Sequence, residues 1–150
     1  MKITKVECFA LLIPDFDADA CSSAQDNLVV KIHTDQDLFG IGETDTNPWG
    51  VKATIESPGT HAIGRGMTET LIGKDPTNVE GIWHELYEKT MMTSRRGLGI
   101  CAIGAIDMAL WDLCGKIYEQ PAWKLLGGSV KDFILPYASL LPEGDNLKDY

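Results

Sequence analysis

The chain has 150 residues, of which 44% are hydrophobic and 23% are charged, as in an ordinary globular domain with a real core. Its formal net charge of −9 argues against nucleic acid or an anionic membrane as a partner, because both would repel it. The charge does not exclude an anionic small-molecule substrate, because a divalent metal ion can invert the local field.

Three β-strands are predicted in the first third of the chain. Residues 3–12 alternate imperfectly between two faces, and Pro14 ends the run. The segments LVVKIHT (28–34) and FGIGET (39–44) are the second and third strands, separated by the turn residues 35–37. The second and third strands are close enough to form a hairpin. We therefore expect a small antiparallel meander with one face that needs cover.

Helical patterns follow the strands. A helix is predicted at 51–56, and a short helical turn is predicted at 68–72. A longer helix begins at residue 78 or 79 and reaches Thr90, and Thr77 and Glu80 match a capping box at its start. Its apolar stripe consists of Val79, Ile82, Trp83, Leu86 and Tyr87.

The longest pattern, from Leu98 to Ile117, places apolar residues at a period of 3.6. Ala102, Ala105 and Ala109 lie beside this stripe, and such small residues let another element approach closely. A short helix is then predicted at 122–126. Strands followed by helices indicate the α+β class.

The four cysteines, Cys8, Cys21, Cys101 and Cys114, form no C-x-x-C pair and have no histidine at zinc-ligand spacing. We expect them to be reduced and structural, in a cytoplasmic protein. The N-terminal apolar run is too short for a signal peptide. We also expect no apolar run to reach the length of a membrane-spanning helix.

The run AIGAIDMALWDLCGK, followed four residues later by PAWKLLGG, resembles the signature of the mandelate racemase/muconate lactonizing group of the enolase superfamily. Ala122 departs from the pattern, because the family usually carries a branched aliphatic residue there. The resemblance extends over residues 3–128. It implies an enolase N-terminal-like fold, in which a three-stranded antiparallel meander is followed by a helical bundle. On this basis 1–128 is a capping domain, and 129–150 begins a truncated (β/α) barrel whose first strand is FILPYA (133–138).

The resemblance also implies the chemistry. Members of this group abstract the proton α to a carboxylate, and Mg²⁺ stabilises the resulting enediolate. A barrel needs roughly 200 residues, so the segment after Gly128 is too short to hold one. The catalytic lysines and the Mg²⁺ ligands are therefore expected beyond residue 150, and we assign no catalytic or metal residue within this chain.

The polar first loop and the sequence RRG at 95–97 favour an acid-sugar dehydratase, with a small-molecule carboxylate, a sugar acid, as the substrate. The alternatives within the group are a racemase, an epimerase or a lactonizing enzyme. An alternative from another class is a non-catalytic truncated module. The resemblance also leads us to expect a homo-oligomer.

Two loops align with the family's capping loops, at 15–23 and at 45–49. Polar groups together with an aromatic side chain suit a lid over a hydroxylated acid. The same residues could instead be solvated turn residues, and Trp49 could simply secure a helix start. The predicted substrate-binding residues of these loops are Phe16, Asp17, Asp19, Asn47 and Trp49.

Three further features have structural and functional interpretations. Arg95, next to Arg96, could bind a carboxylate or phosphate before the long helix, or could form an ion pair or a subunit contact. We include Arg95 among the substrate-binding candidates. Asp107 interrupts the apolar helix, and we expect it to have a structural role, such as a salt bridge within the cap or to the barrel. Gly40-x-Gly42 lacks the third glycine of a dinucleotide fingerprint and is interpreted as strand punctuation.

Overall fold

The structure, a computed structural model, describes residues 1–19 and 25–137 of the chain. Three antiparallel strands form one sheet in the order β1-β2-β3. Their bounds are β1 Ile3–Leu12, β2 Asp26–Thr34 and β3 Phe39–Thr44. The predicted meander is confirmed, and β2 begins two residues before its predicted start because Asp26 and Asn27 pair with the end of β1.

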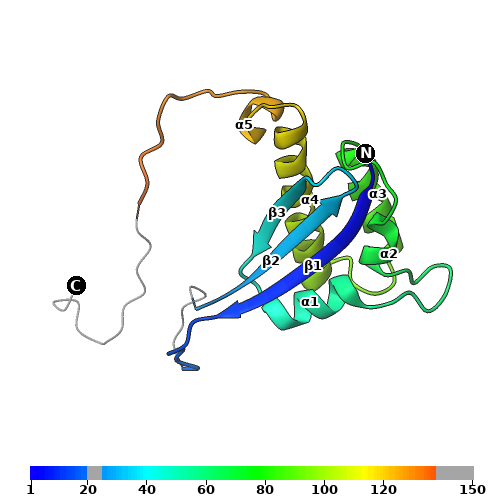
Figure 1. The fold of residues 1–150 in the computed structure, drawn as a ribbon. Helices are drawn as coiled ribbons and strands as arrows, with labels where there is room; N and C mark the ends of the chain where they lie inside the picture. The colour runs from blue at the N-terminus through cyan, green and yellow to red at the C-terminus, as the bar shows by residue number, and fades with distance from the viewer. Residues whose placement is uncertain (20–24, 138–150) are drawn as a thin grey trace.

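The described chain continues as helices that cover one face of this sheet, and Figure 1 shows the sheet in front of the long helix α4. The helix bounds are α1 Pro48–Glu56, α2 Met67–Leu71, α3 Val79–Lys89, α4 Leu98–Ile117 and α5 Ala122–Leu125. Strands followed by helices confirm the α+β class. In α4, the predicted long helix, the apolar stripe packs on β2 and β3, while α1 and α3 pack against other parts of the helix.

The core lies between the sheet and the helices, and α1, α2 and α3 contribute buried residues to it as well as α4. Successive residues of a strand point to opposite faces, so every second residue of β2 from Leu28 onward is buried, and Leu28, Val30 and Ile32 have no exposed surface. The facing residues of α4, such as Ile106 and Leu113, are equally buried. By length and composition alone, α4 could cross a membrane, so the expectation that no run has this length was wrong. In this fold it is the central core helix.

The backbones of β3 and α4 approach one another unusually closely. A β-carbon added at Gly42 would lie 1.9 Å from the carbonyl oxygen of Ala105, and one added at Gly40 would lie 2.0 Å from that of Ala109. These two glycines therefore allow strand and helix backbone to meet with no side chain between them. The close approach predicted for the alanines of this helix is confirmed, and their partner is the Gly40-x-Gly42 segment.

The predicted capping box at the start of α3 was wrong. The side chain of Asp75 accepts hydrogen bonds from both the amide and the hydroxyl of Thr77, at 2.9 and 2.8 Å. Thr77 therefore belongs to an Asx-type turn before the helix and does not occupy the N-cap position. Asn78 is the N-cap residue instead, and it makes no side-chain capping bond.

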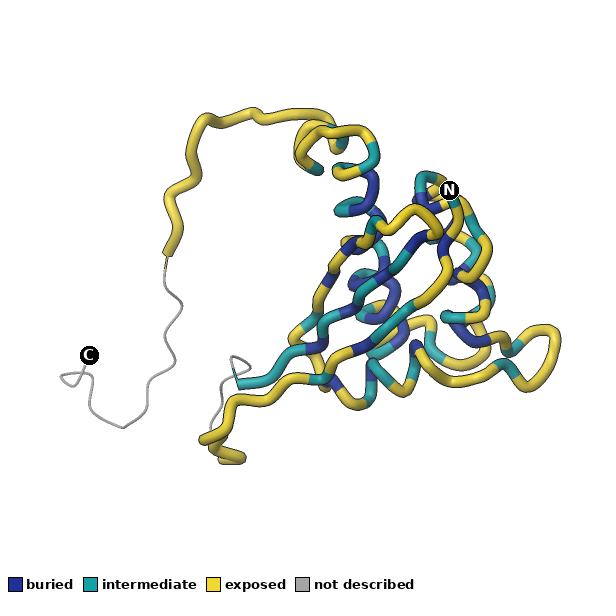
Figure 2. Tube along the Cα trace, viewed as in Figure 1, coloured by how far each residue is buried: buried dark blue, intermediate teal, exposed yellow. Residues whose placement is uncertain are grey.

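The predicted strand at 133–138 is not formed within the described residues. Residues 133–137 have no strand hydrogen bonds and are exposed, and Ala138 lies outside the described range. Figure 2 shows this segment exposed along its length. A strand is stable only when its N–H and C=O groups pair with a neighbouring strand, and this segment leads away from the sheet (Figure 1).

Among the described cysteines, Cys8, Cys101 and Cys114 are free thiols. Cys8 is buried under the sheet, and burial raises the pKa of its thiol to about 11. A neutral, buried thiol behaves as a small apolar side chain, which agrees with the structural role predicted for these residues. Cys21 lies outside the described residues.

Candidate functional site

The two predicted capping loops emerge at the same end of the sheet. Antiparallel pairing places Leu12, at the end of β1, opposite Asp26 at the start of β2. The next pairing places Leu28 opposite Thr44 at the end of β3. The β1–β2 loop and the segment after β3 are therefore neighbours, because β2 holds the strands that lead into both.

A groove of about 590 Å³ lies between these two segments. Phe16 and Asp17 line it from the first loop, and Asn47 and Trp49 line it from the second. The structure thus brings together four of the six predicted substrate-binding residues. Both aromatic side chains are about half exposed, 51% for Phe16 and 54% for Trp49, so each presents an apolar surface to the groove.

The other two predicted residues do not line the groove. The backbone amide of Asp19 donates to Asp17 Oδ1 at 2.9 Å, which places Asp19 in the loop that holds Asp17. Arg95 lies in the connection between α3 and α4, where its guanidinium is 4.8 Å from the centre of the Tyr87 ring. This cation–π contact gives Arg95 a structural partner. The loop residues 20–23 lie outside the described residues.

Gln25 holds the first loop in place, and sequence reasoning did not identify it. Its side-chain oxygen accepts from the amide of Asp17 at 2.7 Å, and its side-chain nitrogen donates to the carbonyl of the same residue at 2.8 Å. The amide of Ile13 donates to the Gln25 carbonyl at 2.9 Å. A lone glutamine before a strand carries no sequence signal, because its partners lie eight and more residues away and are backbone groups.

Asn47 shapes the second loop by capping α1. Its side-chain oxygen accepts from the amide of Gly50 at 3.0 Å, and its backbone is left-handed, with φ 38°. Asparagine is one of the few residues that tolerates this conformation and also caps a helix. The helix therefore begins at Pro48, three residues before its predicted start, and Trp49 is fixed in its first turn.

The groove has an acidic and aromatic lining. Asp17, Asp26 and Asp45 contribute carboxylates, and no Lys, Arg or His is among the described residues that line it. Carboxylates and amide oxygens accept hydrogen bonds from hydroxyl groups, and aromatic rings cover the apolar faces of a sugar-like chain. The same carboxylates would repel a second anion. The groove therefore suits the hydroxylated part of a ligand better than its carboxylate end.

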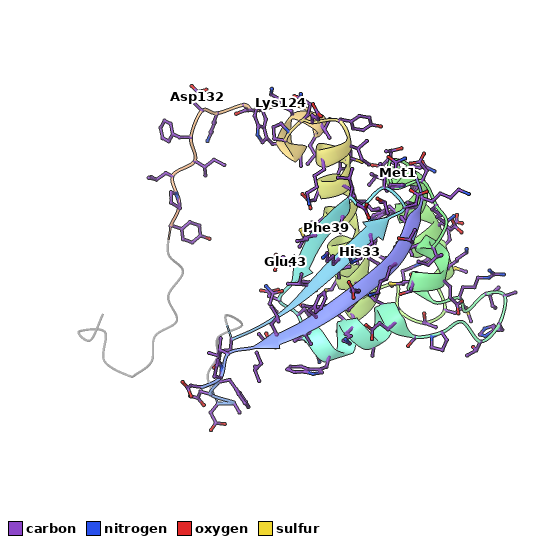
Figure 3. The ribbon with its side chains drawn as sticks, viewed as in Figure 1. Met1, His33, Phe39, Glu43, Lys124 and Asp132 are labelled. Atoms are coloured by element: carbon purple, nitrogen blue, oxygen red, sulfur yellow. The ribbon has the colours of Figure 1, made fainter. Side chains whose placement is uncertain are left out.

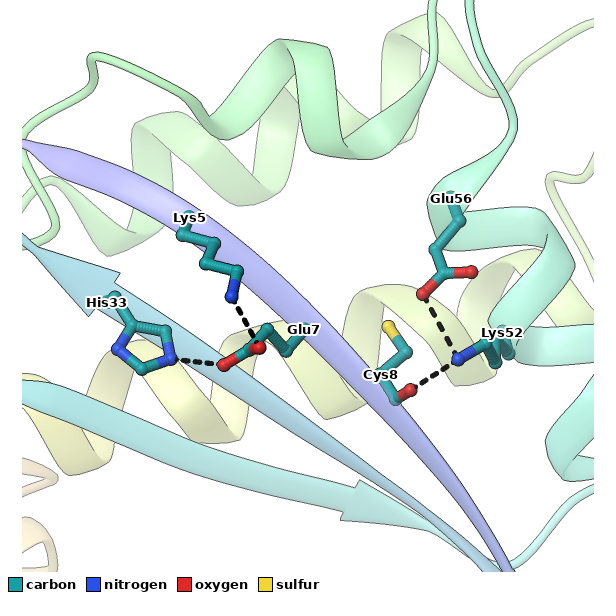
Figure 4. A network of polar contacts seen from close by, with 6 residues as sticks. All are labelled: Lys5, Glu7, Cys8, His33, Lys52 and Glu56. Atoms are coloured by element: carbon teal, nitrogen blue, oxygen red, sulfur yellow. Dashed lines mark hydrogen bonds and ion pairs between the residues drawn. The ribbon is translucent and has the colours of Figure 1, made fainter.

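One cluster of ionisable side chains lies on the outer face of the sheet, away from the groove. Figure 4 shows Glu7 between Lys5 and His33, with a distance of 2.6 Å to each. The hydrogen bond from Lys5, followed by that from His33, lowers the pKa of the Glu7 carboxyl. Figure 3 shows His33 and Phe39 side by side on neighbouring strands. This cluster stabilises an exposed sheet face and contributes nothing to the groove.

No group of three or more His, Cys, Asp or Glu residues within 1–19 and 25–137 is arranged to hold a metal ion. Three carboxylates do line the groove, but they come from separate segments and do not form such a group. Mg²⁺ requires near-octahedral oxygen coordination with close carboxylates. The described residues therefore do not fit a magnesium site, and no catalytic step is assigned to them.

Comparison with known proteins gives consistent results. Residues 11–127 match the family model for the mandelate racemase/muconate lactonizing enzyme N-terminal domain. An L-rhamnonate dehydratase from Saccharopolyspora erythraea is 35% identical over 112 residues, which is 75% of this chain and 26% of that protein. A D-galactonate dehydratase family member from Marinomonas sp. is 41% identical over 113 residues, which is 74% of this chain and 26% of that protein. The chain spans about a quarter of the length of these relatives.

Solved structures show the same likeness. The 3,6-anhydro-D-galactonate cycloisomerase from Zobellia galactanivorans superposes with a TM-score of 0.75 and 32% identity, over 91% of this chain and 35% of that one. An isomerase from Streptomyces coelicolor superposes with a TM-score of 0.68 and 30% identity, over 87% of this chain and 32% of that one. The similarity covers the sheet and the helical layer together.

Proposed function

Because the chain belongs to the mandelate racemase/muconate lactonizing enzyme family of the enolase superfamily, and matches its N-terminal domain, we propose that it is the capping domain of a sugar-acid dehydratase. The parent enzyme would remove the proton α to the substrate carboxylate. The hydroxyl group on the neighbouring carbon would then take up a proton and leave as water, giving an enol that tautomerises to a 2-keto-3-deoxy acid. The names of the relatives, an L-rhamnonate dehydratase and a D-galactonate dehydratase family member, support this substrate class.

The groove between the two loops is the observation that carries the proposal. Its carboxylates accept hydrogen bonds from substrate hydroxyls, while Phe16 and Trp49 exclude water from the carbon chain. Because the lining is acidic, the substrate carboxylate would lie at the opposite end, toward the catalytic domain. In this arrangement the cap sets the chain length and the hydroxyl pattern that the enzyme accepts, and the reacting carbon lies outside the cap.

A second candidate is an isomerase of the same group, such as a racemase or epimerase. The likeness to a cycloisomerase and to an isomerase of known structure supports this candidate. Both candidates share the first step, removal of the α-proton. A racemase or epimerase differs from a dehydratase in the second step, because it returns a proton to the same carbon and a dehydratase loses water.

We further propose that the parent enzyme needs Mg²⁺, with ligands contributed by sequence beyond residue 150. When bound, the ion would stabilise the enediolate charge. In this proposal residues 1–128 form the cap and residues 129–150 lead into the catalytic barrel. We also propose a cytoplasmic homo-oligomer, and the free thiols of Cys8, Cys101 and Cys114 suit a reducing compartment.

The test uses the parent enzyme, in which this chain is followed by its natural continuation. The enzyme is incubated with Mg²⁺ and a panel of sugar acids in D₂O. Loss of water from the acid identifies a dehydratase. Deuterium at the α-carbon without loss of water identifies a racemase or epimerase. If no acid in the panel shows either change, the proposal is overturned. The 150-residue chain alone is expected to show no turnover.

The role of the groove is tested separately with Trp49→Ala. Loss of this apolar surface should raise KM for five- and six-carbon acids about tenfold, equivalent to about 1.4 kcal/mol, and should leave KM for short 2-hydroxy acids unchanged. Phe9→Ala is the matched control, because Phe9 is a half-exposed aromatic residue that does not line the groove. Equal effects of the two substitutions on KM would show that the groove is not part of the substrate site.

A further inference from the structure

A second cavity lies in the helical layer and shares no lining residue with the groove between the capping loops. It has a volume of about 250 Å³ and is bounded by the end of α1, the α1–α2 connection and the turn after α3. A single water molecule in the liquid occupies about 30 Å³, so the cavity is large enough for a small polyatomic ligand.

The charge of this cavity is opposite to that of the rest of the protein. Arg65 and His61 line it, and no Asp or Glu is among its lining residues. The whole chain, in contrast, has 22 acidic and 13 basic residues. Within 1–19 and 25–137, Arg65 has no carboxylate within salt-bridge distance, whereas six ion pairs form elsewhere in the same residues. A cation in an acidic protein that faces a cavity without carboxylates is suited to an external anion.

The segment that carries Arg65 and His61 is fastened at several points. The Gly64 amide donates to the carbonyl of His61, and the Thr60 amide donates to that of Gly64, both at 3.1 Å. The Gly59 amide donates to Glu69 Oε1 at 3.0 Å, which ties the base of this turn to α2. The backbone of this turn is therefore closed into a hairpin-like loop that forms one wall of the cavity.

Neutral donors complete the lining. Thr60 Oγ1 lies 2.9 Å from His61 Nδ1, so one ring nitrogen is engaged, while Nε2 has no hydrogen-bond partner within the described part of the chain. Ser94 contributes a hydroxyl from the turn after α3, and the neighbouring Thr93 hydroxyl donates to the Thr90 carbonyl at 3.5 Å. The amide of Ser94 donates to the Thr90 carbonyl at 2.8 Å, which fixes that wall. Arginine, imidazole and hydroxyl donors around a cavity of this size are the groups that bind an oxyanion.

We propose that this cavity binds a small oxyanion, a phosphate or carboxylate group carried by a small molecule. The Arg65 guanidinium supplies two parallel N–H donors, and His61 and the Ser94 hydroxyl supply further donors around the anion. No carboxylate is among the lining residues, and the Glu69 carboxylate at the base of the turn accepts a hydrogen bond from the Gly59 amide, so an anion in the cavity meets less repulsion than beside an unpaired carboxylate. The proposed site is independent of the proposed enzymatic function, because its test measures binding of the anion and requires no turnover.

The test is a titration of the isotopically labelled 150-residue chain with inorganic phosphate at constant ionic strength, followed by backbone NMR. We expect saturable shifts confined to residues 57–66 and 90–94, with a millimolar dissociation constant, because exposed charge contacts are individually weak. A parallel titration with malonate shows whether phosphate or carboxylate binds more tightly. Shifts spread over the whole surface without saturation would overturn the proposal.

Two variants test the role of Arg65 directly. Arg65→Ala should raise the phosphate dissociation constant about fivefold, and Arg65→Glu should abolish saturable binding by introducing a like charge. Arg96→Ala is the matched control, because Arg96 is also exposed and does not line the cavity. Unchanged amide shifts away from the cavity establish that each variant is folded. Equal weakening by Arg65→Ala and Arg96→Ala would show only non-specific attraction and would overturn the assignment.

Discussion

The carboxylate of Asp112 in α4 accepts a hydrogen bond from the backbone amide of Ile41 in β3, with 2.8 Å between Oδ2 and N. The same oxygen accepts from Lys116 Nζ at 2.7 Å, and Lys116 also donates to the carbonyl of Phe39 at 2.7 Å. Because β3 is an edge strand, its outward backbone groups could otherwise pair with another chain. Two helical side chains therefore occupy part of the open edge of the sheet.

Asp112→Ala should lower the free energy of unfolding by about 1 kcal/mol, less than the usual value for a charged hydrogen bond because the site is partly exposed. It should also increase self-association through the freed edge of β3. Urea denaturation and sedimentation velocity measure the two effects. Asp132→Ala, in the exposed C-terminal segment, is the control, and equal stability of the two variants would contradict the edge-covering role.

Gly42→Ala should destabilise the fold by about 3 kcal/mol or more, because the new β-carbon would overlap the Ala105 carbonyl and push β3 away from α4. Gly104→Ala is the matched control on α4, where an added β-carbon meets nothing within 4 Å. Alanine is a better helix former than glycine, so this control should stabilise the protein by about 0.5–1 kcal/mol. Thermal unfolding measures both, and changes of the same sign would argue against the close approach.

Asn47→Ala should lower stability by about 1–2 kcal/mol, because it removes the cap of α1 and places alanine in a left-handed conformation. Asn47→Gly keeps that conformation without strain, so it should lose only a few tenths of a kcal/mol. Guanidinium denaturation of the two variants separates the backbone requirement from the capping bond. A larger loss for glycine than for alanine would be inconsistent with the positive φ at this position.

Gln25→Ala should loosen the first capping loop, because both side-chain hydrogen bonds to the backbone of Asp17 are lost. Loss of about 1 kcal/mol of local protection would make the Asp17 amide exchange about fivefold faster with solvent deuterium. Gln36→Ala, in the exposed β2–β3 turn, is the control. The loop is not held by Gln25 if the two variants exchange at the same rate at Asp17.

Asp107→Asn should increase stability at neutral pH. Burial is the main cause, and the Glu80 carboxylate the second cause, of the raised pKa of Asp107. The folded state thus binds this proton more tightly than the unfolded chain does. Stability falls as the pH rises from the ordinary pKa of 3.8 through the raised folded value, and the loss persists at pH 7. The gain from Asp107→Asn should therefore vanish in acid.

Asp75→Asn should have the opposite effect on stability from Asp107→Asn. The amide and hydroxyl of Thr77 lower the pKa of Asp75, so its contribution is present above its ordinary value of 3.8 and is lost as the pH falls through the folded value. Asp75→Asn should therefore destabilise the protein at neutral pH. Denaturation curves recorded between pH 3 and pH 7 test both variants, and parallel pH profiles would contradict the two assignments.

Asp107 and Asp112 show which contacts can be predicted from the sequence and which cannot. Both interrupt an apolar helix, and the sequence predicts a structural role for Asp107. Within the described residues Asp107 has no salt bridge and faces Glu80, so the expected ion pair within the cap does not form there. Asp112 instead meets a strand backbone 71 positions away. The pattern of neighbouring residues does not predict a contact between positions so far apart in the chain.

The sequence by itself determined the strands and the long helix, because alternation, helical periodicity and turn residues are properties of neighbouring positions. The resemblance to the family pointed to the two loops as capping loops. It also identified Phe16, Asp17, Asn47 and Trp49, which line one groove. Only the tertiary structure decided that the Gln25 side chain bonds to the backbone of the first loop and that the backbone of Gly42 packs on that of Ala105. These contacts join segments that are brought together by packing. The strand predicted at 133–138 is not formed within the described residues. A strand needs a neighbouring strand to pair with, and the local pattern of residues does not supply one.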